Sequence, residues 1–390
     1  MDKDLSKNKV RKIITLHDPC DEDFLIKSLQ ISGGKLIKKL PLVDGYLCEF
    51  PSEADFALAV RVDNDRIEVD DDIEFRLCWY PGLPFFQHLF PPYSPYAPIN
   101  KPVIKPTPEP PLYNTERVGW GLRRISAPQV WQKLKRRRVR VGIIDTGIDY
   151  NHPDIRESIK GGINTLDGYS QQQFKDDYGH GTHIAGIIGA SGRNARFMGI
   201  NPYVDFYIVK AFDRRGKGNL SDIIEGLDWL YSNQVEIINM SFSTMETNNT
   251  FRRAIRYLDD RGVILVAAAG NDGGSDSVNY PGRFPEVITV SATDRYDRIA
   301  SFSSTGPEVN FCAPGVDIPS AWLNGAYELK SGTSFAAPHV TGIVADLLNY
   351  YGYMPPTKVK EIMVSGAVKL ANLAKEQQGF GIVELPRIIY

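Results

Sequence analysis

Three short segments of this 390-residue chain carry an acid, a base and a nucleophile. Asp145 ends an apolar, β-branched run and is followed by Thr-Gly, and His180 stands in Gly-His-Gly-Thr-His. Ser334 stands in Ser-Gly-Thr-Ser-Phe-Ala-Ala-Pro-His. A serine hydroxyl needs a base before it can attack a carbonyl, and an imidazole titrates in the range that lets it take and return that proton. A carboxylate can hold the imidazole tautomer, so the three residues predict a serine hydrolase.

Acyl transfer also needs donors for the oxyanion that forms during attack. The sequence offers the backbone N–H of Ser334, at the start of an apolar helix pattern, and the side-chain amide of Asn271. Asn271 follows the apolar run 262–269 and Gly270, which together predict a buried parallel strand that ends in a turn. Sites of open α/β sheets lie at the carboxyl ends of such strands, so we expect Asn271 to face the same site.

Strands and helices must alternate to position these residues. The predicted strands are 139–145, 205–211, 236–241, 262–269 and 287–292, and the predicted helices are 180–190, 220–233, 250–260 and 334–350. This order predicts an α/β fold with a doubly wound, mostly parallel sheet that is covered by helices on both faces. Pro338 is expected close to the start of its helix, where a missing N–H is tolerated.

The motifs around Asp145, His180 and Ser334, in this chain order, resemble the subtilisin family of serine proteases. The resemblance covers residues 116–390 and implies a serine endopeptidase that works through an acyl-enzyme. The alternative is a non-catalytic scaffold or binding protein on the same fold. Because Asp145, His180, Ser334 and Asn271 are all present, the enzyme is favoured.

Residues 1–76 form a separate small α+β unit in this interpretation. Their order of short strands and their acidic run 66–72 resemble the subtilisin propeptide, a ferredoxin-like domain. In that family the propeptide templates folding and then inhibits the protease with its tail in the substrate cleft. Residues 77–115 hold eleven of the 26 prolines and predict an extended linker with the processing site near 114–116. The catalytic domain follows at 116–390.

Substrate binding is carried over from the family. Segments 217–220 and 241–243 are expected to pair with an extended peptide. Leu220, Ile223 and Phe242 are expected to line an apolar pocket for the substrate side chain that lies three residues before the one in the primary pocket. The candidate substrate-binding residues are Gly218, Leu220, Ser241, Phe242, Ser243 and Asn279. Asn279 is expected to make the primary pocket shallow, and Asp272 and Asp276 would bias it towards basic side chains or simply be solvated, so the primary preference stays open.

No cofactor is expected, with calcium as the alternative that the resemblance leaves open. His180 and His183 lie three apart without the glutamate of a zincin motif, and His152, His183 and His339 fit structural roles. Asp149 and Asp154 are rival candidates for the triad acid, but both fall in the polar turn after the strand. In subtilisins the residue matching Asp154 binds calcium together with a loop matching 191–197. Here that loop carries Arg193 and Arg196, whose positive charges would repel a calcium ion. We therefore expect the site to be empty and one of these arginines to pair with Asp154.

The composition limits partners and compartment. A net charge of −2 gives no reason to expect nucleic acid as a partner, and no transmembrane run is present. The polar, charged N-terminus predicts no secretory signal and therefore a cytoplasmic protein, with secretion, as in most of the family, as the alternative. Cys20, Cys48, Cys78 and Cys312 show no paired spacing and are expected to be reduced thiols. The expected partners are protein or peptide substrates and the chain's own propeptide.

Overall fold

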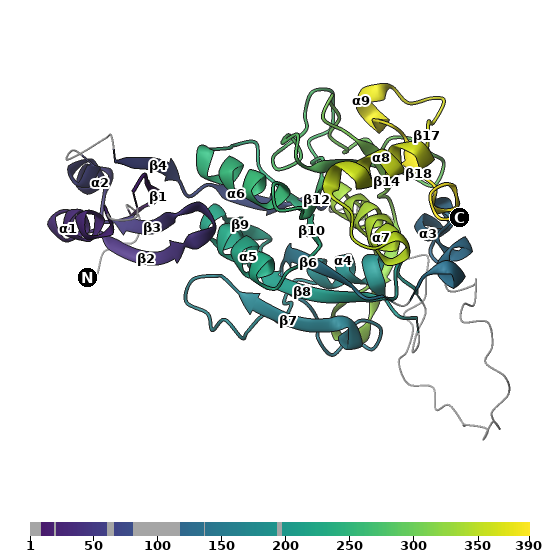
Figure 1. The fold of residues 1–390 in the computed structure, drawn as a ribbon, viewed down its shortest axis with the longest axis horizontal. Helices are drawn as coiled ribbons and strands as arrows, with labels where there is room; N and C mark the ends of the chain where they lie inside the picture. Colours follow the sequence, from purple (N-terminus) through teal and green to yellow (C-terminus); the bar gives the residue numbers. More distant parts are fainter. Residues whose placement is uncertain (1–8, 19–20, 61–65, 81–117, 136, 193–196) are drawn as a thin grey trace, which may run out of the picture.

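A seven-stranded sheet lies at the centre of the larger of two folded units in the computed structural model (Figure 1). The structure describes residues 9–18, 21–60, 66–80, 118–135, 137–192 and 197–390. The strands, in sheet order, are β14 (Phe311–Pro314), β13 (Ile288–Thr293), β12 (Ile264–Ala268), β10 (Ile237–Met240), β6 (Val139–Asp145), β8 (Val204–Lys210) and β7 (Ile159–Asn164). All neighbouring pairs are parallel, so the predicted doubly wound parallel sheet is confirmed.

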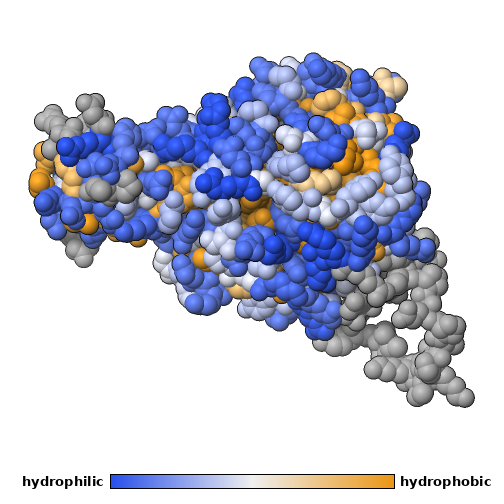
Figure 2. All heavy atoms as spheres, viewed as in Figure 1, coloured by the Kyte–Doolittle hydropathy of each residue, from blue (hydrophilic) through white to orange (hydrophobic). Residues whose placement is uncertain are grey.

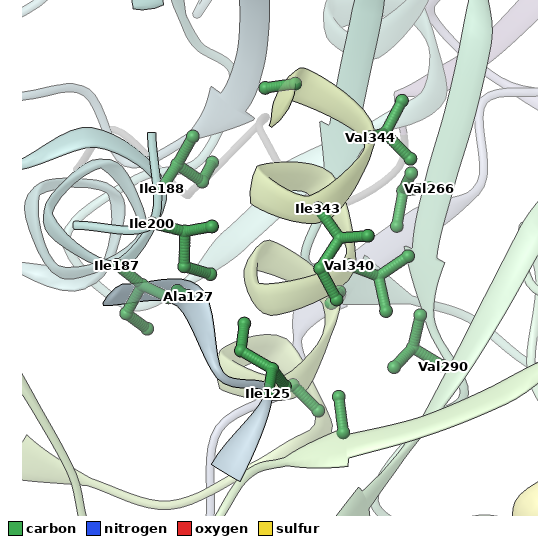
Figure 3. Close-up of a cluster of buried hydrophobic side chains, with 14 of the residues drawn as sticks. Ile125, Ala127, Ile187, Ile188, Ile200, Val266, Val290, Val340, Ile343 and Val344 are labelled. Atoms are coloured by element: carbon green, nitrogen blue, oxygen red, sulfur yellow. The ribbon is translucent and has the colours of Figure 1, made fainter. Parts of the chain in front are cut away.

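Helices cover both faces of this sheet. They are α4 (His180–Gly189) and α7 (Thr333–Tyr351) on one face, and α5 (Leu220–Ser232) and α6 (Asn249–Asp259) on the other (Figure 1). Successive strand residues point to opposite faces, so Ile237 packs in the core beneath α4 and α7 while Ile238 packs beneath α5 and α6. Figure 3 shows α7 presenting Val340, Ile343 and Val344 towards Val266 and Val290 of the sheet.

The smaller unit, residues 9–71, is a four-stranded antiparallel sheet in the order β2-β3-β1-β4. Its elements are β1 (Val10–Leu16), α1 (Glu22–Ser32), β2 (Lys35–Leu40), β3 (Gly45–Phe50), α2 (Glu53–Val60) and β4 (Ile67–Asp71). The β-α-β-β-α-β succession is the ferredoxin-like arrangement that the sequence predicts. Its own core joins Ile14, Leu25 and Phe50, so this unit has a hydrophobic centre apart from the larger one.

Short elements complete the larger unit and its contact with the smaller one. They are β5 (Glu74–Leu77), α3 (Trp120–Arg124), β9 (Lys217–Asn219), β11 (Phe242–Ser243), β15 (Ile318–Ala321), β16 (Tyr327–Lys330), α8 (Pro356–Gly366), β17 (Ala367–Val368), α9 (Lys375–Gln378) and β18 (Ile382–Val383). No helix in the described ranges has the length and apolar character needed to span a bilayer.

The element boundaries differ from the expectation in identifiable ways. β7 and β14, the edge strands, are absent from the prediction because each is short and contains glycine, proline or polar residues. Pro338 is the sixth residue of α7 rather than near its first turn, so the expected position is wrong. Its missing N–H leaves the carbonyl of Ser334 without a helical partner, and the hydroxyl of Ser241 donates to that carbonyl at 2.9 Å instead.

One carboxylate of the smaller unit and one from the residue that directly follows it bind two helix N-termini of the larger unit. Asp72 accepts hydrogen bonds from the backbone N–H and the hydroxyl of Ser221 in α5, and Asp70 accepts from the same two groups of Thr250 in α6. Free N–H groups and the helix dipole favour negative charge at these positions. The face of the molecule in Figure 2 is mainly hydrophilic, with smaller hydrophobic patches.

A buried charge cluster extends the same contact. The ammonium of Lys38 in β2 lies 2.8 Å from Asp222 and 2.9 Å from Glu225 of α5 and donates to the carbonyl of Thr165. Burial alone would lower the pKa of Lys38, but the two carboxylates outweigh it and raise it. Burial raises the pKa of Asp222 to about 6 despite the attraction of Lys38.

This cluster makes the stability of the assembled chain depend on pH. The pKa of Asp222 is raised to about 6, so the folded chain holds this proton more tightly than the unfolded chain does. The resulting contribution to the free energy of unfolding is complete below about pH 4, the ordinary pKa of an aspartate, and is lost as the pH rises through 6. We expect the free energy of unfolding of the wild type to fall by about 3 kcal/mol between pH 4 and pH 7. This fall should be absent in Asp222→Asn. Denaturant titrations of the wild type and Asp222→Asn at a series of pH values measure this, and an unchanged pH slope would contradict it.

Candidate active site

Asp145 and His180 come from neighbouring elements at the carboxyl ends of the parallel strands. Asp145 is the last residue of β6 and is fully buried, and His180 is the first residue of α4. The Nδ1 atom of His180 lies 2.8 Å from both carboxylate oxygens of Asp145. Thr146 donates its backbone N–H to the carboxylate at 2.8 Å, which holds the acid in place. This contact places the proton of the imidazole on Nδ1 and leaves Nε2 as the acceptor.

Small residues allow the helix and the strand end to approach closely. A methyl group on Gly181 would lie 2.2 Å from the carbonyl oxygen of Gly147, so only glycine fits there. The N–H of Gly181 donates to the hydroxyl of Thr146 at 3.1 Å. The motifs Asp-Thr-Gly and His-Gly-Thr-His therefore pack against each other where β6 ends and α4 begins. The glycine of each motif lies too close to a neighbouring backbone to carry a side chain.

Asn271 is held so that its amide nitrogen faces Ser334. Its Oδ1 atom accepts hydrogen bonds from the backbone N–H of Thr333 at 3.0 Å and from the Thr333 hydroxyl at 2.8 Å. These two donors require the oxygen on their side, so Nδ2 points the other way. A methyl group on Gly332 would lie 3.3 Å from this Nδ2 atom and 3.1 Å from Oγ of Ser334, so both atoms converge on one point.

Three buried polar atoms of these residues have no hydrogen-bond partner in the described part of the chain: Nε2 of His180, Oγ of Ser334 and Nδ2 of Asn271. Buried polar groups are almost always paired, and the exceptions often mark a reactive site. Here the three atoms are an acceptor, a hydroxyl and a donor, the set that attack on a carbonyl requires. Asp145 and its hydrogen bonds account for the orientation of the first of them.

A segment of the same chain, residues 73–80, fills the groove that leads to these atoms; we call it the groove segment. Its strand β5 is the middle strand of a three-stranded antiparallel sheet between β11 and β9. The pairs include Phe75 with Gly218 and Leu77 with Phe242. This is the strand addition by which an extended peptide binds to exposed sheet edges. The strand runs through Leu77, beyond the expected limit of the N-terminal domain at residue 76.

The carbonyl of Cys78 lies at the centre of the site. Its oxygen accepts the backbone N–H of Ser334 at 3.2 Å, and the N–H of Cys78 donates to the carbonyl of Ser241 at 3.2 Å. A methyl group on Gly332 would lie 2.4 Å from the Cys78 oxygen, so this oxygen shares the convergence point of Ser334 and Asn271. Beyond it, the N–H of Tyr80 donates to the carbonyl of Ser331 at 2.9 Å. The backbone is thus held on both sides of the Cys78–Trp79 peptide bond.

Phe75, three residues before Cys78, enters the apolar pocket that the sequence analysis describes. It is fully buried in the cluster that contains Leu220, Ile223 and Phe242. Its ring meets Phe242 edge-on, with centroids 5.6 Å apart, and Phe251 at 5.1 Å. The pocket is therefore made from α5, α6 and β11, and Phe251 is a wall residue that the sequence analysis does not name.

A cavity lies beside Cys78, at the place expected for the primary pocket. A cavity of about 470 Å³ opens between residues 243–246 and 271–279. Asn279 lines it and donates to Asp272 at 2.5 Å, which draws the Asn279 amide to one wall. The thiol of Cys78 donates to the hydroxyl of Ser243 at 3.0 Å, and burial raises its pKa to about 12, so it stays neutral. The cavity has room for a longer side chain than cysteine.

Three other histidines are buried and make hydrogen bonds to the backbone. His152, His183 and His339 are buried and each contacts a main-chain carbonyl, of Ala326, Glu328 and Phe335 respectively. Burial lowers the pKa of His183 to about 3 and that of His339 to about 4, so both are neutral. The free cysteines in the described ranges, Cys48, Cys78 and Cys312, are buried, whereas Cys20 lies outside those ranges.

Asp149 and Asp154 do not compete with Asp145 for the imidazole. Asp154 is buried and accepts the hydroxyl of Tyr327 at 2.6 Å, while Asp149 accepts N–H groups of Asn151 and Gly325. No group of three or more metal-ligating side chains occurs in the part of the chain that the structure describes. The expected pairing of Arg193 or Arg196 with Asp154 falls on residues outside that part.

Sequence reasoning missed the residues that orient the site. Thr333 fixes the amide of Asn271, and Cys78 and Trp79 occupy the groove although the sequence analysis assigns them to the linker. The signal was available in the stretch 73–80, Ile-Glu-Phe-Arg-Leu-Cys-Trp-Tyr, whose alternating apolar and polar residues are typical of a half-buried strand. The proline-rich stretch 81–117 lies outside the described residues.

Comparison with known proteins agrees with this geometry. Residues 136–381 match the model of the subtilase family. The minor extracellular protease Epr of Bacillus subtilis (strain 168) is 39% identical over 267 residues, which cover 68% of this chain but only 41% of Epr. The thermostable alkaline protease of Halalkalibacterium halodurans is 38% identical, with 66% of this chain and 70% of that protein covered. Subtilisin DY of Bacillus licheniformis is 36% identical, with 66% and 94% covered. The chain therefore belongs to the subtilase family and is a subtilisin-like serine endopeptidase.

Proposed function

We propose that Ser334, His180 and Asp145 form the catalytic triad and that Asn271 and the backbone N–H of Ser334 bind the oxyanion. Oγ of Ser334 attacks the carbonyl carbon while Nε2 of His180 takes its proton, and Asp145 stabilises the imidazolium. His180 then protonates the leaving amine, and water hydrolyses the acyl-enzyme by the same route. The observation that carries this proposal is the convergence of Cys78 O, Ser334 Oγ and Asn271 Nδ2 at Gly332.

We further propose that the chain is a self-inhibited precursor and that Cys78–Trp79 is the first bond cut. The smaller unit acts as the propeptide, and the groove segment blocks the cleft as a bound substrate would. The backbone pairing on both sides of Cys78 supports this bond over the position near 114–116 expected from the sequence. The domain limits then become a propeptide through residue 78, followed by the proline-rich segment and the catalytic domain.

The test is labelling of the full chain with a fluorophosphonate probe, together with mass spectrometry of its termini. We expect labelling of Ser334 once the chain is processed, and a new N-terminus at Trp79. Absence of labelling in the processed chain would favour the non-catalytic scaffold. Labelling with a first cut only near 114–116 would leave the triad in place and contradict the proposed bond.

The primary pocket, the cavity beside Cys78, predicts a preference for positively charged side chains in substrates. Its cavity is lined by the carboxylates of Glu246 and Asp272, and the other residues that the larger unit contributes are uncharged. In peptides that differ only at the residue before the cleaved bond, we expect kcat/KM for Lys to exceed that for Glu by roughly tenfold, the scale of two partly exposed charge contacts. Equal rates for Lys and Glu would remove the charge argument. Asp272→Asn should narrow the difference, whereas Asp317→Asn, outside this cavity, should not.

A further inference from the structure

The first residue after the proposed cleaved bond sits in an aromatic and cationic pocket. The Trp79 indole meets the Tyr178 ring edge-on, with centroids 5.7 Å apart and planes at 85°. The ammonium of Lys330 lies 5.4 Å from the centroid of the Trp79 ring and 4.2 Å from that of Trp322. Lys330 thus stands between an indole of the groove segment and an indole of the larger unit.

Tyr178, Trp322 and Lys330 form this pocket, and each lies beside the start of α4 or α7, the helices that carry His180 and Ser334. Tyr178 lies two residues before His180, and its backbone N–H donates to Asp176 at 3.0 Å. The Trp322 indole lies against Gly179, where a methyl group would be 2.5 Å from the ring. Lys330 ends β16, directly before the loop to Ser334, and pairs with Glu328 at 2.5 Å. Contacts within the larger unit therefore hold the Trp322 ring and the Lys330 ammonium in this pocket.

The next residue of the groove segment extends the same preference. The Tyr80 ring stacks on Phe302, with centroids 4.9 Å apart and planes at 22°. The N–H of Tyr80 donates to the carbonyl of Ser331, so the backbone is fixed at this position. In an extended chain, successive side chains point to opposite sides. Trp79 and Tyr80 accordingly meet different walls, and both walls are aromatic.

We propose that the leaving-group side of the groove selects an aromatic residue immediately after the cleaved bond, through Tyr178, Trp322 and Lys330. A cation attracts the face of an aromatic ring, and edge-to-face ring contacts add to burial, whereas an aliphatic side chain gains only burial. A cationic residue is disfavoured there because it meets the charge of Lys330. This inference rests on the serine endopeptidase function proposed above.

Acyl transfer isolates this side of the groove from the acyl side. The full chain, after processing, is acylated with one N-blocked peptide ester. The amino-acid amides of Trp, Tyr, Leu and Lys, each with a free α-amino group, then compete with water to react with the acyl-enzyme. In capture, the amine nitrogen forms a bond to the acyl carbon as the bond to Ser334 Oγ breaks, and the amine proton passes through His180 to that oxygen. We expect capture by Trp amide to exceed capture by Leu amide roughly fivefold, and Lys amide to be poorest.

Variants assign the preference to the pocket. Lys330→Met should lower the ratio of Trp to Leu capture several-fold, while Lys369→Met, an exposed lysine after β17, should not change it. Both products form from one acyl-enzyme, so their ratio does not depend on how much of a variant folds. Equal capture of Trp and Leu amides, or an unchanged ratio in Lys330→Met, would overturn this inference alone. Failure of Ser334 to react with ester and fluorophosphonate would overturn the proposed function and this inference with it.

Discussion

The Ser334→Ala chain should remain uncut at Cys78–Trp79 and inactive on peptides. In subtilisin, loss of the nucleophile is measured to lower kcat about 10⁶-fold, and the same loss is expected here because the Cys78 carbonyl already meets the backbone N–H of Ser334. The Cys78 carbonyl thus already lies beside Ser334, so removal of one hydroxyl tests the chemical step. Intact mass and N-terminal sequencing over several days of incubation measure the result.

A matched serine and a rescue experiment complete that test. Ser331→Ala removes a hydroxyl three residues away that bonds the backbone of Asp317, and this variant should mature normally. Adding a trace of processed wild type to the Ser334→Ala chain shows whether the bond can also be cut between molecules. Cleavage at Cys78–Trp79 in the purified Ser334→Ala chain alone would refute autocatalytic maturation.

Phe75→Ala should release the cleaved chain from self-inhibition. Phe75 is the most deeply buried side chain of the groove segment and packs on Phe242 and Phe251. Removing a buried phenylalanine ring costs about 3–5 kcal/mol in protein cores, so we expect the inhibitory segment to bind at least 100-fold more weakly after processing. Progress curves on a quenched peptide should lose the lag that slow release of the segment gives the wild type.

Neighbouring variants separate the ring from the backbone pairing. Arg76 lies on the same strand with a largely exposed side chain, and Arg76→Ala removes its ion pair with Glu74 but keeps every backbone hydrogen bond of β5, so its lag should match the wild type. Phe75→Leu retains an apolar side chain and should fall between the two. A Phe75→Ala chain with a wild-type lag would show that backbone pairing and the carboxylate caps at Asp70 and Asp72, rather than this pocket, hold the segment.

Three kinds of contact would hold the chain in the proposed self-inhibited state. Phe75 supplies apolar burial, β5 supplies backbone hydrogen bonds, and Asp70 and Asp72 cap α6 and α5. Only the last kind responds to charge, and the Asp222 cluster lies beside it. The pH dependence expected for Asp222 therefore acts on the docking of the smaller unit rather than on the triad.

The sequence by itself predicted the five inner strands of the central sheet and the candidate site residues. The β-branched runs that become β6, β10 and β12 are buried on both faces, so their hydrophobicity is continuous and visible without coordinates. The small residues around Asp145 and His180 reflect a close backbone approach within one corner, which is a local requirement. Local requirements of this kind leave their mark on sequence.

The tertiary structure alone decided which part of the chain fills the groove and which way each polar atom points. Cys78 meets Ser334 only because β5 inserts between β9 and β11, and Trp79 meets Lys330 only because β16 ends beside α4. Thr333 selects the orientation of the Asn271 amide through hydrogen bonds that no sequence pattern encodes. These contacts join residues far apart in the chain, and their geometry is set by the packing of whole elements, so composition and spacing do not specify them.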